Sequence, residues 1–366
     1  MRVSRRTFLG STAVMSASRA YAQRSVARNP SDPFTIGCLN VGTYSHLSEI
    51  WAPLMNPRGN GRDMPFTGMR ITHCWDIEPE KGAAFAKTYR CELVKSFEDM
   101  VGKVDGIISG GYYNHPWNHI IHQPYLEAGL PNLINRPFSN SLAKTRQIIE
   151  SARKHGARIL VPSSYEHNEA VSRAKAWAAT RKISCYTAAN VQDDYPTHGV
   201  HGLYMICRAI AEAGNPIVSV AFRAQNWYTA PAVMTFEHSD RAGRRFFGTL
   251  HQLPTTAGSL EIHTSDEYGG KDFLIRMGTG YPYERTEFWA TPIWAFQHMA
   301  LNGEMPQSFE QILHKSQAFM AGWRSILVND GRPVLLQDVP DDWEAPVELP
   351  SRAQDATIAL FKRKFG

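Results

Sequence analysis

Apolar residues gather in short runs that alternate with segments of helical spacing over the first half of the chain. A run at residues 34–39 is followed by Gly42, which is typical of a buried strand that enters a tight turn. Further strands are predicted at 69–75, 104–109, 132–135 and 158–161, with helices from about 45 and at 78–89, 117–128 and 142–154. Strands and helices that alternate at this spacing predict a parallel, doubly wound sheet.

The pattern changes after residue 165. A strand at 184–190 lies between helices at 168–179 and 200–212, and β-type runs follow at 218–224, 249–253, 259–264 and 273–277. These runs predict a mixed or antiparallel sheet with an open face. Helices are predicted at 289–302 and 309–328, and a last helix follows the Pro-rich stretch 338–350. We expect an α/β protein with domains at 34–162 and 163–330 and an extension at 331–366 that packs back on the fold.

The first 22 residues differ from the rest of the chain. Residues 4–9 read S-R-R-T-F-L, a run of small apolar residues follows, and A-Y-A at 20–22 offers a cleavage site. This pattern predicts a twin-arginine signal and a periplasmic or secreted protein. Without this leader, which carries four arginines and no acid, the formal net charge falls from +5 to +1.

Composition narrows the kinds of partner. A chain of 366 residues with 43% hydrophobic residues can bury a full core. After the leader no basic block argues for nucleic acid, and no apolar run approaches the roughly 20 residues that span a bilayer. Five cysteines without a C-x-x-C pair indicate neither a zinc site nor a disulfide framework. Cys38 and Cys74 would approach one another if the first two strands are neighbours, and an oxidising compartment would then let them bond.

Several short motifs stand in a fixed order through the middle of the chain: V-D-G-I-I at 104–108, His119, E-A-G at 127–129, N-R-P at 135–137, A-R-K-H-G at 152–156 and H-G-V-H-G at 198–202. Their order and spacing resemble the Gfo/Idh/MocA superfamily of glucose-fructose oxidoreductases and inositol dehydrogenases. The resemblance implies a Rossmann domain that binds a dinucleotide at 34–162, a substrate and oligomerisation domain at 163–330, and a homo-oligomer, a dimer or a tetramer.

The turn after the first strand departs from the superfamily pattern. It reads N-V-G-T-Y-S at 40–45, so Gly42 alone survives from G-x-G-x-x-G, although Asn tolerates a left-handed turn. A turn into a helix presents N–H groups to a pyrophosphate, and Asp76 would accept hydrogen bonds from a ribose hydroxyl, which favours NAD over NADP. The expected cofactor-binding residues are Asn40, Gly42, Thr43, Tyr44, Asp76 and Asn135. A remnant that binds no nucleotide is the alternative.

The catalytic positions implied by the resemblance also differ from the superfamily. Arg136 stands at the position of the lysine in the superfamily motif E-K-P. Arginine cannot act as a tunable acid or base. It can bind hydroxyls or a carboxylate, or it can belong to a buried ion pair. His201 matches the catalytic histidine, which suits proton transfer. Thr197 replaces the usual aspartate, so the orienting carboxylate is missing. His198 is additional, and with His201 it could share a metal, a substrate carboxylate or a proton relay, or form a simple helix-terminal pair. No metal is predicted, because no further ligand is evident.

Polar and aromatic residues gather after predicted strand ends, where a sugar would bind. The expected substrate residues are Tyr113, His115, His119, Tyr165, His167 and Thr197, within a wider group that includes Tyr112, Asn114, Trp117, Glu166, Trp227 and Tyr228. Three functions fit: an exported oxidoreductase that acts on a carbohydrate with tightly bound NAD(P), a non-redox or metal-assisted lyase or glycosidase for a uronic-acid-type sugar, and an inactive sugar-binding homologue. In the first, His201 is the acid or base and Arg136 the clamp.

Overall fold

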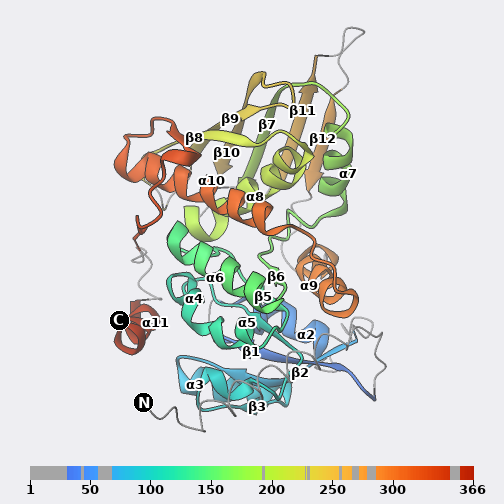
Figure 1. Cartoon of the computed structure of the whole chain (residues 1–366), viewed down its shortest axis with the longest axis vertical. Coiled ribbons are helices and arrows are strands. Elements are labelled where there is room, and N and C mark those ends of the chain that lie inside the picture. The colour runs from blue at the N-terminus through green and yellow to red at the C-terminus, as the bar shows by residue number, and fades with distance from the viewer. Residues whose placement is uncertain are drawn as a thin grey trace, which may run out of the picture.

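A computed structural model of the chain contains two sheets, one above the other in Figure 1. The structure describes residues 31–42, 45–56, 68–191, 194–226, 228, 231–254, 258–265, 272–277, 286–346 and 355–366. The predicted leader, Thr43, Tyr44 and Trp227 lie outside these residues.

The first sheet is parallel and six-stranded, in the order β3-β2-β1-β4-β5-β6. Its strands are β1 (Phe34–Leu39), β2 (Met69–Trp75), β3 (Glu92–Leu93), β4 (Gly106–Ser109), β5 (Asn132–Ile134) and β6 (Ile159–Leu160). The strand order reverses between β1 and β4, so the crevice at the carboxyl ends of these two strands is where a doubly wound sheet binds its ligands. The predicted doubly wound sheet is confirmed.

Helices cover this sheet, and two of them differ from the prediction. The elements are η1 (Leu47–Trp51), α2 (Ala52–Met55), α3 (Pro79–Tyr89), η2 (Phe97–Met100), η3 (His115–Trp117), α4 (Asn118–Ile121), α5 (Gln123–Glu127) and α6 (Leu142–His155). The single helix predicted at 117–128 is wrong: it breaks at His122, because Pro124 opens α5 and has no N–H to continue α4. The first helix begins with a π-helical turn at Leu47 rather than near Ser45.

The second sheet has seven strands in the order β12-β11-β7-β10-β9-β8-β13, antiparallel except for the pair β7 and β10. They are β7 (Ile183–Val191), β8 (Ile217–Ala224), β9 (Ala232–Ser239), β10 (Arg245–Leu253), β11 (Gly258–Thr264), β12 (Phe273–Met277) and β13 (Val334–Leu335). The predicted mixed sheet is confirmed. Strand β9 was not predicted, although its burial alternates from Ala232 onward as in a strand with one buried face.

One hydrophobic cluster joins this sheet to α7 (Glu169–Ala178), α8 (Val200–Ala209) and α10 (Phe309–Val328). Short turns η4 (Tyr195–Gly199), η5 (Ala211–Ala213) and η6 (Leu336–Asp338) flank these elements. Helix α9 (Thr286–Asn302) packs instead on the cluster of the first sheet, through Ile293 and Phe296. In the described part of the chain no helix is long and apolar enough to cross a membrane.

Helix α11 (Asp355–Phe365) also returns to the first sheet, where Ile358 and Phe361 join the cluster of Phe97 and Trp117. Cys38 and Cys74 are direct partners in the β1–β2 register, as expected from neighbouring strands. Both are free thiols in the structure, so the bond considered from the sequence is not formed there.

Candidate active site

The carboxyl ends of β1 and β2 carry the predicted cofactor residues. Asn40 follows β1 in a left-handed conformation (φ 54°), and its buried side-chain amide has no hydrogen-bond partner at either Oδ1 or Nδ2. Asp76 follows β2, and its carboxylate accepts hydrogen bonds of 2.7 Å from the backbone N–H of Gly42 and of Glu78. A Cβ atom at Gly42 would lie only 2.7 Å from Cδ of Lys81, so a close approach requires glycine here.

A pocket opens beside these residues. Its lining consists of Asn40, Gly42, Asp76, Ile77, Glu78, Gly111, Tyr112, Tyr113, Asn114, Thr357 and Phe361. Burial raises the pKa of Asp76 to about 6, against the opposing effect of the backbone N–H groups that it accepts. An unpartnered amide and a carboxylate in the lining of the pocket fit the hydroxyl and phosphate groups of a nucleotide.

Asn135, the remaining predicted cofactor residue, lies at the base of the crevice rather than in this pocket's lining. Its Nδ2 donates to the carbonyl of Gly110 (2.8 Å), and its Oδ1 accepts from the backbone N–H of Arg136 (3.0 Å) and from Nδ1 of His46 (3.3 Å). The side chain therefore ties the ends of β4 and β5 to the turn after β1, and it positions Arg136 and His46.

Arg136 and His201 are in direct contact, although 65 residues separate them in the chain. Nη2 and Nε of the guanidinium lie 2.8 and 3.3 Å from Nε2 of His201, whose Nδ1 lies 2.7 Å from Oγ of Ser163. A guanidinium only donates hydrogen bonds, so Nε2 must be the acceptor and the proton of the neutral ring must sit on Nδ1, donated to Ser163. Burial lowers the pKa of His201 well below 6.5, and the charge of Arg136 lowers it further.

Aromatic rings surround this pair. The ring of Tyr112 lies 4.7 Å from Cζ of Arg136 and 4.8 Å from the ring of His46. The rings of Tyr165 and His198 lie 5.3 and 6.4 Å from that of His201. Arg136 is only 1% exposed and Nη1 has no hydrogen-bond partner. Because Tyr112 also lines the pocket described above, it links the Arg136–His201 pair to the crevice.

A carboxylate lies near this pair, but Asp194 places it on His198 and not on His201. Asp194 caps η4 by accepting from the backbone N–H (2.6 Å) and Oγ1 (2.5 Å) of Thr197, and it lies 3.8 Å from Nδ1 of His198. Nδ1 of His201 contacts Ser163 instead, so among the described residues this histidine does lack the usual orienting carboxylate, as the presence of Thr197 predicted. Asp194 was missed because it stands three residues before Thr197, although an Asp followed by Pro196 is a common helix start.

The predicted substrate residues separate into two groups. Tyr165 and Thr197 lie beside His201 and His198, and Tyr113 lines the pocket. The other three face elsewhere: His115 contacts the carbonyl of Tyr112 and the ring of Trp323, His119 is half-buried, and His167 lies 3.8 Å from Glu166 in a separate buried cluster with Lys315. The structure thus does not bring these three histidines to the Arg136–His201 pair, because η3 and α4 carry the first two away from the strand end and Glu166 holds the third.

Possible metal ligands gather elsewhere. Ligand atoms of Glu261 and His263, on β11, and of Asp272, just before β12, lie within 4.8 Å of one another, so this group does not involve the two histidines of η4 and α8. Ser163 and His46 join the Arg136–His201 group without having been predicted. Their residue types carry no local signal, because each reaches the group only through the folding of the sheet.

Buried histidines make the stability of the fold depend on pH. Burial lowers the pKa of His115, His122 and His238 to about 4, whereas an unfolded chain has histidine pKa values near 6.5. Below pH 6.5 the unfolded state therefore binds protons that the folded state refuses, and each histidine removes about 2 kcal/mol of stability by pH 5. Asp76, with its raised pKa, acts in the opposite direction over the same range.

We expect the Tm to fall by roughly 10 °C between pH 7.5 and 5. Calorimetry across this range tests it, and a constant Tm would contradict the assignment of these rings as neutral.

No family model and no curated protein sequence matches this chain. Solved structures match its fold at low identity. The myo-inositol dehydrogenase of Lactobacillus casei, solved with NAD(H) and myo-inositol, matches with a TM-score of 0.66 and 12% identity over 86% of this chain and 98% of that chain. The scyllo-inositol dehydrogenase of the same organism, with NAD(H) and scyllo-inositol, gives 0.65 and 12% over 84% and 100%. An oxidoreductase of Agrobacterium radiobacter, solved with NAD+, L-tartaric acid and magnesium, gives 0.61 and 12% over 83% and 98%. The chain thus has the fold of these dehydrogenases.

Proposed function

We propose that this chain is a divergent Gfo/Idh/MocA oxidoreductase that moves a hydride between a bound NAD and a carbinol of a sugar or sugar derivative. The observation that carries the proposal is a neutral, buried His201 whose basic nitrogen is held by Arg136 next to the dinucleotide crevice. The unpartnered amide of Asn40 and the carboxylate of Asp76, both in the lining of the pocket, supply polar partners for a dinucleotide. NAD, when bound, accepts or returns the hydride.

The residues of the chain handle the proton and the oxygen of the substrate. For oxidation, the carbinol O–H proton passes to Nε2 of His201 as the hydride leaves the same carbon, and a carbonyl forms. Arg136 must first turn its N–H groups from His201 to the substrate oxygen, which frees Nε2. The resulting imidazolium stays oriented because Ser163 accepts the hydrogen bond from Nδ1. Since the pKa of His201 is low, the proton leaves readily, and the partly exposed ring of His198 offers a route to solvent.

The test of the proposed function is the content of the purified protein. We expect denaturation to release close to one NAD per chain, detected by mass spectrometry, and we expect reduction of that NAD when a sugar or polyol substrate is added. Protein that contains no dinucleotide and binds none when it is added would refute hydride chemistry.

A non-redox lyase acting on a uronic-acid-type sugar is the second candidate. It is favoured by Arg136, which replaces the lysine of the superfamily motif and has an unpartnered Nη1 for a carboxylate. In this reaction His201 would remove a proton next to a carbonyl. Product formation without any change in the nicotinamide absorbance would identify it.

The buried cation also predicts a substrate preference. A carboxylate that accepts a charge-assisted hydrogen bond from Nη1 of Arg136 gains about 1.5 to 3 kcal/mol, so we expect sugar acids to have a kcat/KM roughly 10- to 100-fold above that of the matching neutral sugars. The measurement compares each aldonic or uronic acid with its neutral counterpart at one ionic strength. Equal values for the two members of each pair would contradict a carboxylate site at Arg136.

We also propose that the protein is exported by the twin-arginine route and works as an oligomer. The S-R-R-T-F-L motif and the A-Y-A site support export, and a cofactor loaded before export suits a compartment without free NAD. Support for an oligomer comes from the outer face of the second sheet, where large apolar side chains are exposed: Val233, Phe247, Leu274 and Leu335. Fractionation and light scattering would test the two parts.

A further inference from the structure

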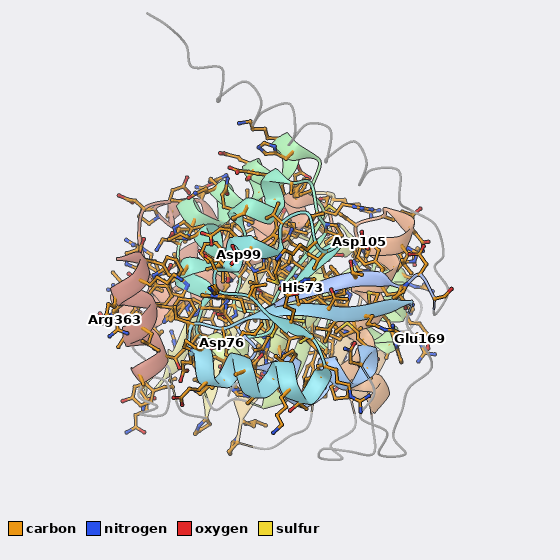
Figure 2. All side chains as sticks on the ribbon, turned by 90° about the horizontal axis from the view of Figure 1, so that it is seen from below. His73, Asp76, Asp99, Asp105, Glu169 and Arg363 are labelled. Carbon is orange, nitrogen blue, oxygen red and sulfur yellow. The ribbon has the colours of Figure 1, made fainter. Side chains whose placement is uncertain are left out.

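The C-terminal helix α11 forms part of the pocket beside Asp76. Thr357 and Phe361 stand on this helix, yet they line the same pocket as Asn40, Gly42 and Asp76. Figure 2 shows α11, marked by Arg363, beyond the end of β2 at which Asp76 lies. The helix belongs to neither sheet. It therefore adds a wall to a crevice that the doubly wound sheet alone would leave open.

Specific contacts hold α11 in this place. Oγ1 of Thr357 donates to Oε1 of Glu78 (2.6 Å), which also accepts from Nζ of Lys81 (2.7 Å). The ring of Phe361, 1% exposed, stacks on Trp117 at 4.9 Å with an interplanar angle of 15°. Nζ of Lys364 lies 5.0 Å from the ring centre of Trp75. One hydrogen bond and two ring contacts therefore hold α11 against the end of β2 and against the segments that follow β2 and β4.

The segment 341–345, which precedes α11 in the chain, is also anchored on the first domain. The backbone N–H of Ala345 donates to the carbonyl of Asn140 (2.8 Å), and Nδ2 of Asn140 donates to the carbonyl of Ala345 (3.1 Å). Ion pairs join the start of α6 to the same segment, from Lys144 to Glu344 (2.7 Å) and from Arg146 to Asp341 (2.9 Å). The extension is therefore anchored on α6 as far as Ala345.

We propose that α11 is the outer wall of the adenosine half of the dinucleotide site and that it slows release of NAD. This inference rests on the proposed function. Asp76 is the carboxylate next to which a ribose lies in a doubly wound fold, and the apolar side chains of Ile77 and Phe361 line the pocket beyond it, where a nucleobase requires apolar contact. Asp76 and Glu78 give this end of the pocket a negative charge, which suits a free 2′-hydroxyl and opposes a 2′-phosphate. A wall that must move before the ligand leaves lowers the dissociation rate.

The experiment compares NAD release from the full chain and from three variants. Phe361→Ala removes the ring from the pocket wall, and Thr357→Val removes the hydrogen bond to Glu78. Arg363→Ala, an exposed position on the same helix, is the matched control. Each protein is loaded with NAD and diluted into a trap that consumes free NAD. We expect at least tenfold faster release from Phe361→Ala, faster release from Thr357→Val and the parental rate from Arg363→Ala.

The outcomes separate this inference from the proposed function. Bound NAD in the parent with unchanged release from both Phe361→Ala and Thr357→Val would overturn the role of α11 and leave the function standing. A parent protein that neither contains nor binds NAD would refute the function itself. If Phe361→Ala lowers the Tm strongly, Thr357→Val, which leaves the Phe361–Trp117 stack in place, decides the question.

Discussion

Replacing His201 with glutamine is expected to lower kcat by about 10²- to 10⁴-fold with a much smaller change in KM, because a positioned acid or base contributes a factor of this size. Nε2 of His201 is the basic atom of the group around Arg136, because the guanidinium can only donate to it and the ring proton therefore lies on Nδ1, facing Ser163. The glutamine side chain can still accept a hydrogen bond from Arg136, so the buried guanidinium keeps a partner, but it cannot take up a proton. Steady-state kinetics with the best sugar substrate measures the effect.

Two comparisons make the His201 result specific. His198→Gln alters the partly exposed neighbour, which bonds to Thr197 rather than to Arg136, so we expect a loss of no more than about tenfold. The NAD content of His201→Gln should equal that of the parent, because His201 does not line the pocket beside Asp76. A kcat within threefold of the parental value would remove His201 from the mechanism.

The fold could be predicted where burial and periodicity agree. The predicted strand 69–75 and helix 309–328 are β2 and α10 with the same bounds: β2 carries apolar residues at both of its ends, and α10 begins with a Ser308 capping box. Strand β9 was missed although its residues alternate between a buried and a more exposed face, which is the signal that would have identified it. Helix 117–128 was predicted as one element because its apolar spacing continues past Pro124, whereas the missing N–H ends α4.

Only those site residues that belong to a sequence motif could be predicted. Arg136 and His201 were both named from the sequence, and the structure places them in contact. The tautomer and the low pKa of His201 could not be predicted, because they depend on burial and on the contact with Arg136, which forms only in the folded chain. The contact between Thr357 and Glu78 joins residues 279 positions apart, and no local pattern encodes it. Long-range packing therefore decides which polar side chains near strand ends belong to the site.

Replacing Arg136 with methionine is expected to lower kcat/KM by about 10²- to 10³-fold, which is the usual effect of removing one donor to the oxygen that gains charge. It is also expected to move the acidic limb of the pH profile to higher pH. The positive charge of Arg136 lowers the pKa of His201, so its removal lets that pKa rise toward 6.5. His201 must be unprotonated to act as a base, and activity is therefore lost at a higher pH in the variant. The measurement is kcat/KM against pH.

Arg136→Lys separates the charge of the side chain from its shape. Lysine keeps a positive charge beside His201 but loses the fork that places Nη2 and Nε on one acceptor atom, so we expect part of the kcat/KM loss while the acidic limb stays at the parental pH. An acidic limb that does not move in Arg136→Met would show that the limb does not report His201. Arg136→Met removes the positive charge and Arg136→Lys keeps it. An acidic limb that moves equally in both variants would therefore show that the guanidinium acts by positioning the ring of His201.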